Sequence, residues 1–220
     1  MRTRFHDRSE GGRLLAENLG NYAKRPGALV LALPRGGVPV AAVVARRLRA
    51  PLDVFVVRKL GLPGHAELAM GALAAGGVRV VNNDVVDSLH IPQSVFDSVA
   101  VEEQQELERR ERLYRGELPP PDINGKTIIL VDDGIATGST MMAAVAALRQ
   151  LNADRIVVAA PVIAGSTYYQ MRSVADDVAA VIVPEKFLGV GQWYEDFAQT
   201  TDDEVRELLA QAGTLHHASS

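Results

Sequence analysis

The chain has 220 residues, of which 47% are hydrophobic and 23% are charged, a balance typical of one folded globular domain rather than of disorder. Its 23 basic and 27 acidic residues give a formal net charge of −4 without a basic block, so we expect no nucleic-acid partner. The absence of cysteine excludes disulfides and thiolate metal sites. No apolar run approaches the roughly 18 residues of a membrane helix, which predicts a cytoplasmic protein without a membrane partner.

Apolar runs rich in β-branched residues alternate along the chain with stretches of helical spacing. In chain order they predict a strand at Ala28–Leu33, a helix from Pro39 to about Arg49, a strand at Leu52–Val57, a hairpin within Ala69–Val81, a helix at Gln93–Arg115, a strand at Thr127–Val131, a helix after Thr140, and strands at Arg155–Val162 and Val178–Val183. This repetition predicts an α/β fold with a parallel sheet flanked by helices. Ligands on such sheets bind beyond the carboxyl ends of the strands, so chemistry is expected in the strand-to-helix loops.

The loop after the strand Thr127–Val131 combines two acids with small residues and hydroxyl groups. Asp132 and Asp133 end the strand at the ligand-binding edge, where carboxylates can hold sugar hydroxyls or lie near Mg²⁺. Small residues leave the loop amides open to an anion, and hydroxyls follow beside a helix N-terminus, where the dipole favours phosphate. The small residues are Gly134, Ala136 and Gly138, and the hydroxyl groups belong to Thr137, Ser139 and Thr140. The combination predicts a site for a phosphorylated sugar.

Two other interpretations of this loop stay open. The aspartates can simply end a strand while the small residues cap a helix, with no ligand involved. A receiver-type domain also gathers aspartates around Mg²⁺ at strand ends, although it normally lacks a hydroxyl- and glycine-rich phosphate cradle directly after the pair.

The stretch I-I-L-V-D-D-G-I-A-T-G-S-T, Ile128–Thr140, resembles the motif with which type I phosphoribosyltransferases bind 5-phosphoribosyl 1-diphosphate (PRPP). The resemblance implies a Rossmann-like parallel sheet with a small hood. It implies one domain over residues 1–212, with a core at about 28–183 and a hood at about 1–27 and 184–212. The terminal residues 213–220 are expected to form a flexible tail. The resemblance also implies that Asp132 and Asp133 bind the ribose hydroxyls. Mg²⁺ would bind together with PRPP and contact Asp132 or Asp133 through a water molecule. The 5-phosphate would be bound by Ala136, Thr137, Gly138, Ser139 and Thr140.

A second loop, L-P-R-G-G-V-P at Leu33–Pro39, fits the same template. Gly36 and Gly37 permit unusual backbone geometry and let amides face a diphosphate, and Arg35 adds a positive fork suited to phosphate oxygens. In the resembling family this is the pyrophosphate loop, often with a non-proline cis peptide, which we expect here at Arg35–Gly36. Standing alone, the loop would be an ordinary glycine-rich turn.

The stretch Arg58–Ala72 follows the next predicted strand and supplies Arg58, Lys59 and His65 to the candidate catalytic set. Arg58 and Lys59 are expected to meet the diphosphate from the opposite side. Gly61, Pro63 and Gly64 predict a loop able to move, similar to the lid that resembling enzymes close over PRPP. His65 is either a donor to the leaving diphosphate or an exposed loop histidine, and Glu67 is either an acid near the sugar or a surface ion pair. Many relatives are homodimers, and we expect dimer contacts in this region.

The aromatic-dense stretch Pro184–Phe197 belongs to the expected hood. In purine enzymes of the family a lysine and an aromatic residue near here recognise the base, which makes Lys186 and Phe187 candidate acceptor-binding residues, supplemented by Trp193 or Tyr194. The same rings can instead be hood core, since large rings are usually packing residues. Phe5, Asp7 and Arg8 are expected in the same hood without an assigned role.

The resemblance implies transfer of the 5-phosphoribosyl group from PRPP to a nitrogen acceptor, a small molecule such as a nucleobase, with release of diphosphate. The alternative is a PRPP-binding regulatory or catalytically silent domain that acts through a protein partner. Ala136 stands where the 6-oxopurine enzymes carry an aspartate, so hypoxanthine–guanine salvage in its usual form is not expected. Hoods vary so much that the acceptor stays open.

Overall fold

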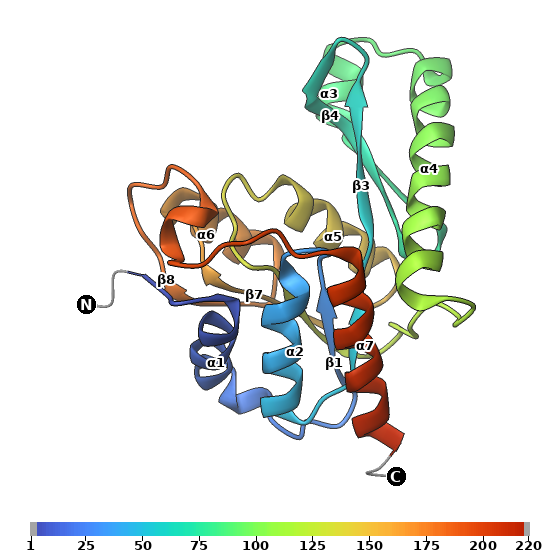
Figure 1. The fold of residues 1–220 in the computed structure, drawn as a ribbon. Helices are drawn as coiled ribbons and strands as arrows, with labels where there is room; N and C mark the ends of the chain where they lie inside the picture. The colour runs from blue at the N-terminus through green and yellow to red at the C-terminus, as the bar shows by residue number, and fades with distance from the viewer. Residues whose placement is uncertain (1–3, 218–220) are drawn as a thin grey trace.

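The computed structural model describes residues 4–217, which fold around a five-stranded parallel sheet in the order β2-β1-β6-β7-β8. Helices α1, α2 and α7 lie on one side of this sheet and α5 and α6 on the other (Figure 1). The predicted α/β fold, a parallel sheet between helices, is confirmed. The strands are β1 (Ala28–Ala32), β2 (Leu52–Val54), β6 (Thr127–Val131), β7 (Arg155–Val162) and β8 (Asp177–Ile182), and the helices are α1 (Arg8–Asn18), α2 (Gly37–Leu48), α5 (Ser139–Gln150), α6 (Gly165–Val174) and α7 (Asp202–His217).

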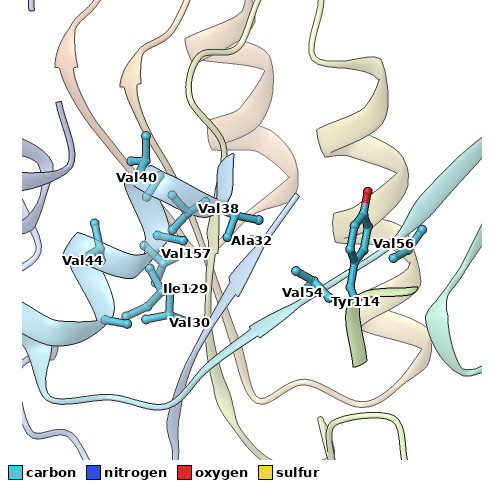
Figure 2. Packing of buried hydrophobic residues seen from close by; sticks show 14 of the residues in the cluster. Val30, Ala32, Val38, Val40, Val44, Val54, Val56, Tyr114, Ile129 and Val157 are labelled. Atoms are coloured by element: carbon cyan, nitrogen blue, oxygen red, sulfur yellow. The ribbon is translucent and has the colours of Figure 1, made fainter. Parts of the chain in front are cut away.

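The central strands are apolar throughout because both of their faces are covered. Alternate residues enter two separate cores, as Ile129 and Val157 do on the side of α2 and Ile128 and Val158 on the side of α5. Figure 2 shows Ile129 and Val157 beside Val44 of α2. Burying a side chain of this size contributes about 1.5–3 kcal/mol, so each strand is fixed from both faces.

Residues 57–115 form a second unit, which we call the arm. Its antiparallel sheet has the order β3-β4-β5, and the long helix α4 packs along it. The predicted helix at Gln93–Arg115 and the predicted hairpin with its turn at Gly76–Gly77 are confirmed. Figure 1 shows the arm standing above the helices of the parallel sheet. Its elements are β3 (Val57–Leu62), β4 (His65–Ala74), β5 (Val78–Val81), α3 (Asn83–Ser88) and α4 (Gln93–Arg115).

The predicted strand Leu52–Val57 is wrong in its second half. β2 pairs with β1 and ends at Val54, whereas Val57 begins β3 and pairs with Ala74 of the arm. The crossover residues Phe55 and Val56 are themselves buried, in different cores, so the apolar run gives no sign of the change of sheet. The expected loop around Gly61–Gly64 is shorter than predicted, because Gly61 and Leu62 belong to β3 and only Pro63 and Gly64 form the turn before His65.

The N-terminal segment of the described chain pairs with residues 193–195 beside the parallel sheet. The N–H of Phe5 donates to the carbonyl of Trp193 at 2.8 Å, and the N–H of Glu195 donates to the carbonyl of Phe5 at 2.9 Å. The expected hood segment 1–27 is therefore only partly hood, because α1 packs against α2 and β8 and covers the sheet instead. Helix α7 continues to His217, so residues 213–217 of the expected tail are helical, and residues 218–220 lie outside the described part.

One hydrophobic core joins the arm to the parallel sheet. Leu15 of α1, Leu60 of β3 and Leu107 of α4 belong to a single cluster of buried side chains. Figure 2 shows Val54 and Val56, on either side of the crossover between the sheets, near Tyr114 of α4. Within residues 4–217, none of the helices combines the length and the apolar composition needed to cross a bilayer.

Candidate ligand-binding site

The acid pair lies at the carboxyl end of β6, directly after Val131, as predicted. The side chain of Asp133 is only 12% exposed, and its Oδ2 lies 2.8 Å from Nε of Arg8. Asp132 is half-buried, and its Oδ1 accepts the N–H of Asp133 at 2.8 Å. Within the described part of the chain no group donates a hydrogen bond to Asp132 Oδ2, which leaves that oxygen for a ligand.

Burial and mutual repulsion make the acid pair hard to ionise fully. Burial, and then the neighbouring Asp133 carboxylate, raise the pKa of Asp132 well above its usual value. Burial also raises the pKa of Asp133, against the lowering effect of the Arg8 guanidinium. A ligand that brings hydroxyl donors or a cation favours the charged form of these groups, so the pair is suited to a polyhydroxyl or metal-bearing ligand.

The loop after the acid pair presents a row of unpaired backbone donors. Among residues 4–217, no acceptor takes a hydrogen bond from the backbone N–H groups of residues 136–140, which lead into the N-terminus of α5. Thr137, Ser139 and Thr140 are exposed, and the hydroxyls of Thr137 and Ser139 lie 3.3 Å apart. Gly138 has φ +75°, and a Cβ there would lie 2.4 Å from Cε of Met171, so this turn requires glycine. The arrangement suits an anion.

The glycine loop after β1 packs directly on the acid pair. A Cβ on Gly36 would lie 2.2 Å from Oδ2 of Asp133, and one on Gly37 would lie 2.7 Å from the carbonyl of Val131. The N–H of Gly37 donates to the carbonyl of Leu33, whereas no described residue accepts from the N–H groups of Arg35 or Gly36. Two of the three candidate diphosphate-binding residues therefore keep a free amide beside the carboxylates.

The cis peptide of this loop lies at Pro34–Arg35, so the prediction of Arg35–Gly36 is wrong by one residue. Gly36 is the N-cap of α2 and already has helical backbone angles. The guanidinium of Arg35 extends toward the start of α7, where its Nη1 lies 3.9 Å from Oδ1 of Asp202.

The arm brings its basic pair to the phosphate loop but leaves His65 elsewhere. Arg58, Lys59 and Thr140 line one groove of about 530 Å³ between β3, α4 and the start of α5. Arg58 is not free there, because its Nε donates to Glu103 of α4 at 2.6 Å. His65 lines a separate apolar groove of about 440 Å³ with arm residues such as Leu89. The side chain of Glu67 lies outside what the structure describes.

The candidate acceptor residues fall into two groups. Tyr194 is 3% exposed, its ring stacks on Phe197 at 5.1 Å, and its hydroxyl donates to the backbone carbonyl of Asp133, so it fits the packing interpretation. Phe187 and Trp193 are half-buried and stack on each other with ring centroids 6.3 Å apart. Lys186 is exposed next to this aromatic pair.

Arg8 is the functional candidate that sequence reasoning missed, since it was placed in the hood without a role. It begins α1, and besides Asp133 it reaches the carbonyl of Ala198, 2.7 Å from Nη1, with its Cζ 4.0 Å from the centroid of the Phe197 ring. The sequence signal that could have identified Arg8 is its position in the first turn of a helix. A cation in the first turn of a helix opposes the macrodipole, which indicates that a partner elsewhere holds it.

The residues present fit Mg²⁺ carried by a phosphorylated ligand, rather than a protein cage. Among residues 4–217 there is no group of three or more histidine or acidic side chains able to hold a metal. Asp133 has one oxygen on Arg8, whereas Asp132 keeps Oδ2 available. Mg²⁺ usually retains several waters and takes one or two carboxylates beside phosphate oxygens, which this donor set can provide.

Fold and site together define a parallel-sheet protein with an anion-binding loop and an acid pair at one edge, and comparison with known proteins identifies its family. The family model described as "Phosphoribosyl transferase domain" matches residues 6–194. Curated proteins from two strains of Mycobacterium tuberculosis, CDC 1551 / Oshkosh and H37Rv, both named provisionally as phosphoribosyl transferases, are 46% identical over 209 residues. A crystal structure from Thermus thermophilus is 40% identical with a TM-score of 0.86, covering 94% of this chain and 98% of that one.

The chain therefore belongs to the phosphoribosyl transferase domain family. The match to the two mycobacterial proteins covers 94% of this chain but 47% of theirs, so the chain spans about half the length of these curated relatives.

Proposed function

We propose that the chain is a phosphoribosyltransferase that moves the 5-phosphoribosyl group of PRPP to a nitrogen acceptor and releases diphosphate. The row of unpaired amides at residues 136–140 beside Asp132 carries the proposal. The glycine loop at Gly36 adjoins the same acids. Anion donors, carboxylates and a second loop of free amides follow one another in the order that the 5-phosphate, the ribose and the diphosphate of PRPP require.

In the proposed reaction the bond from the anomeric carbon to the diphosphate oxygen breaks, and a bond from that carbon to the acceptor nitrogen forms. The diphosphate leaves with the bonding electron pair, and the nitrogen loses its proton to solvent. Positive charge would develop on the sugar, where Asp132 would stabilise it, while Arg35 and Lys59, together with the Mg²⁺ that PRPP would bring, would neutralise charge on the leaving diphosphate. Alignment and electrostatics suffice, so no covalent enzyme nucleophile is needed. Arg58 takes part only after exchanging Glu103 for a phosphate oxygen.

For the acceptor we propose a site under the hood, next to the stacked pair Phe187 and Trp193 and the exposed Lys186. Stacking rings and a mobile cation suit a planar acceptor with a hydrogen-bond-accepting edge. The buried Tyr194 is better explained as the packing residue that carries this pair.

One observation favours the second candidate, a PRPP-binding domain without turnover. Arg58 lines the groove beside the phosphate loop but is paired with Glu103, and His65 lies in a different groove, so neither of these two residues of the candidate catalytic set is available to a ligand at the site in this conformation. The two candidates share the ligand and differ in diphosphate release.

The test is a calorimetric titration of PRPP with Mg²⁺ into the wild type and into the Asp132→Asn/Asp133→Asn double variant. We expect magnesium-dependent binding by the wild type and a loss of about 100-fold or more in the variant, since each lost charge-assisted contact costs about 1.5–3 kcal/mol. Asp176→Asn/Asp177→Asn is the matched control, because these adjacent acids lie at the start of β8, and this variant should bind as the wild type does. No binding by folded wild type would contradict the proposal. Binding of PRPP without release of its diphosphate in the presence of any nucleobase tested favours the second candidate.

The proposal includes a cytoplasmic homodimer without nucleic-acid or membrane partners. Within the expected contact region, Leu68 is 38% exposed, and Leu89, which lines the same apolar groove, is 49% exposed. Exposed side chains of this size around a groove support contact there. Sedimentation velocity should give a species of twice 23.6 kDa, and a monomer at all concentrations would rule the dimer out.

A further inference from the structure

Arg8 connects the hood to the acid pair by three different contacts. Its Nε lies 2.8 Å from Oδ2 of Asp133, its Nη1 lies 2.7 Å from the carbonyl of Ala198, and its guanidinium stacks on Phe197. The side chain is 12% exposed, as is that of Asp133. The ion pair is therefore close to fully desolvated and joins residues 125 positions apart in the chain.

The placement of Arg8 is costly for the fold alone. It begins α1, where a cation opposes the helix dipole, and desolvating a guanidinium and a carboxylate offsets most of their attraction. An apolar pair of similar volume generally stabilises a fold as much or more. The arrangement is easier to understand if it serves the carboxylate rather than the packing.

The contacts also fix which oxygen of Asp133 is left for a ligand. Oδ2 is held between Arg8 and the backbone at Gly36, where there is no room for a Cβ. Among the described residues no donor reaches Oδ1. Two of the three guanidinium nitrogens of Arg8 already have protein acceptors, so the residue is poorly placed to grip a phosphate with its fork.

We infer that Arg8 is a positioning residue of the ribose site, which orients the Asp133 carboxylate so that its free oxygen meets a sugar hydroxyl. The inference rests on the proposed function for the identity of the sugar. Arg8 thereby connects the hood segment at Phe197 and Ala198 to the acid that would contact the ribose. Removing Arg8 should affect ligands that contain a ribose and spare ligands that occupy the phosphate loop alone.

The experiment compares two probes, ribose 5-phosphate and inorganic phosphate, titrated into the full chain while the amide resonances of residues 136–140 are followed. In Arg8→Gln we expect the affinity for ribose 5-phosphate to fall about tenfold, the factor that corresponds to one good hydrogen bond to a charged group. Affinity for inorganic phosphate should stay within about twofold. Arg8→Lys keeps the charge and should recover part of the loss.

Arg13→Gln is the matched control, because Arg13 lies on the same helix with its contacts to Glu10 and Glu17 at the surface, and it should change neither affinity. An equal loss for both probes in Arg8→Gln would assign Arg8 a merely structural role and overturn the inference, as would no loss for either. If the wild type binds ribose 5-phosphate but releases no diphosphate from PRPP, the proposed reaction fails while the result for Arg8 still stands.

Discussion

Asp132 is a residue at which the proposed function opposes the stability of the fold. Burial and the adjacent Asp133 raise its pKa in the folded chain, above the value of about 3.9 expected when the chain is unfolded. As pH rises past about 3.9, the unfolded chain releases this proton first, so the folded state loses relative stability until the pH passes the folded pKa. Each unit by which the pKa is raised costs about 1.4 kcal/mol at neutral pH.

Replacing Asp132 with asparagine should therefore stabilise the protein. The asparagine side chain can still accept the N–H of Asp133 through its oxygen and has no charge to desolvate, and it also relieves Asp133 of a neighbouring charge while Arg8 remains. We expect Asp132→Asn to match the wild type near pH 4 and to exceed it in free energy of unfolding at pH 8, measured by urea denaturation. Asp154→Asn, at an exposed position away from the acid pair, is the matched control and should not reproduce the gain in free energy of unfolding at pH 8. A variant less stable than the wild type at pH 8 would show that the carboxylate is favourable in the empty site.

At the scale of elements, the central parallel strands and the hairpin and long helix of the arm could be predicted from the sequence, whereas β3 and the crossover into the arm could not. Thr127–Val131 and Arg155–Val162 are strands with the predicted bounds, because a run of residues buried on both faces has few alternatives to a central strand. The same reasoning extended the predicted strand from β2 into the start of β3. The buried residues between them, Phe55 and Val56, include no glycine or proline that would mark where the chain leaves one sheet for the other. Only the three-dimensional arrangement shows that boundary.

The candidate site shows the same limit. Residues that act within one loop, such as Asp132 to Thr140, could be assigned together because local spacing sets their geometry. Contacts between distant segments were not predictable: Arg8 with Asp133, Arg58 with Glu103, and Tyr114, whose hydroxyl donates to Asp202 beside Arg35. Each of these pairs joins a residue of the candidate site, or one beside it, to a segment that no local pattern connects with it. The missed contacts are therefore the ones that decide how the loops are held.

For the whole molecule, the shared core decides whether the arm and the parallel sheet unfold together. They have separate sheets, which would suit two domains, yet Leu60 and Leu107 of the arm belong to the same buried cluster as Leu15. α5 also packs against the arm strands as well as against β7. Separating the arm would expose part of this cluster on both sides, and each exposed large side chain would cost about 1.5–3 kcal/mol.

We therefore expect one cooperative unfolding transition, although a chain of 220 residues is longer than most two-state domains. Calorimetry should give an enthalpy of about 150 kcal/mol near 60 °C, from about 0.7 kcal/mol per residue, and an equal van't Hoff value. Trp193 is the chain's only tryptophan, so its fluorescence reports the hood, while far-UV circular dichroism includes the 23-residue α4 of the arm. The two signals should change at the same temperature. A hood transition that precedes the loss of helix would show that the contacts of Arg8 and Tyr194 are too weak to hold the hood on the core. A rise of the midpoint temperature with protein concentration would show that assembly contributes to the stability.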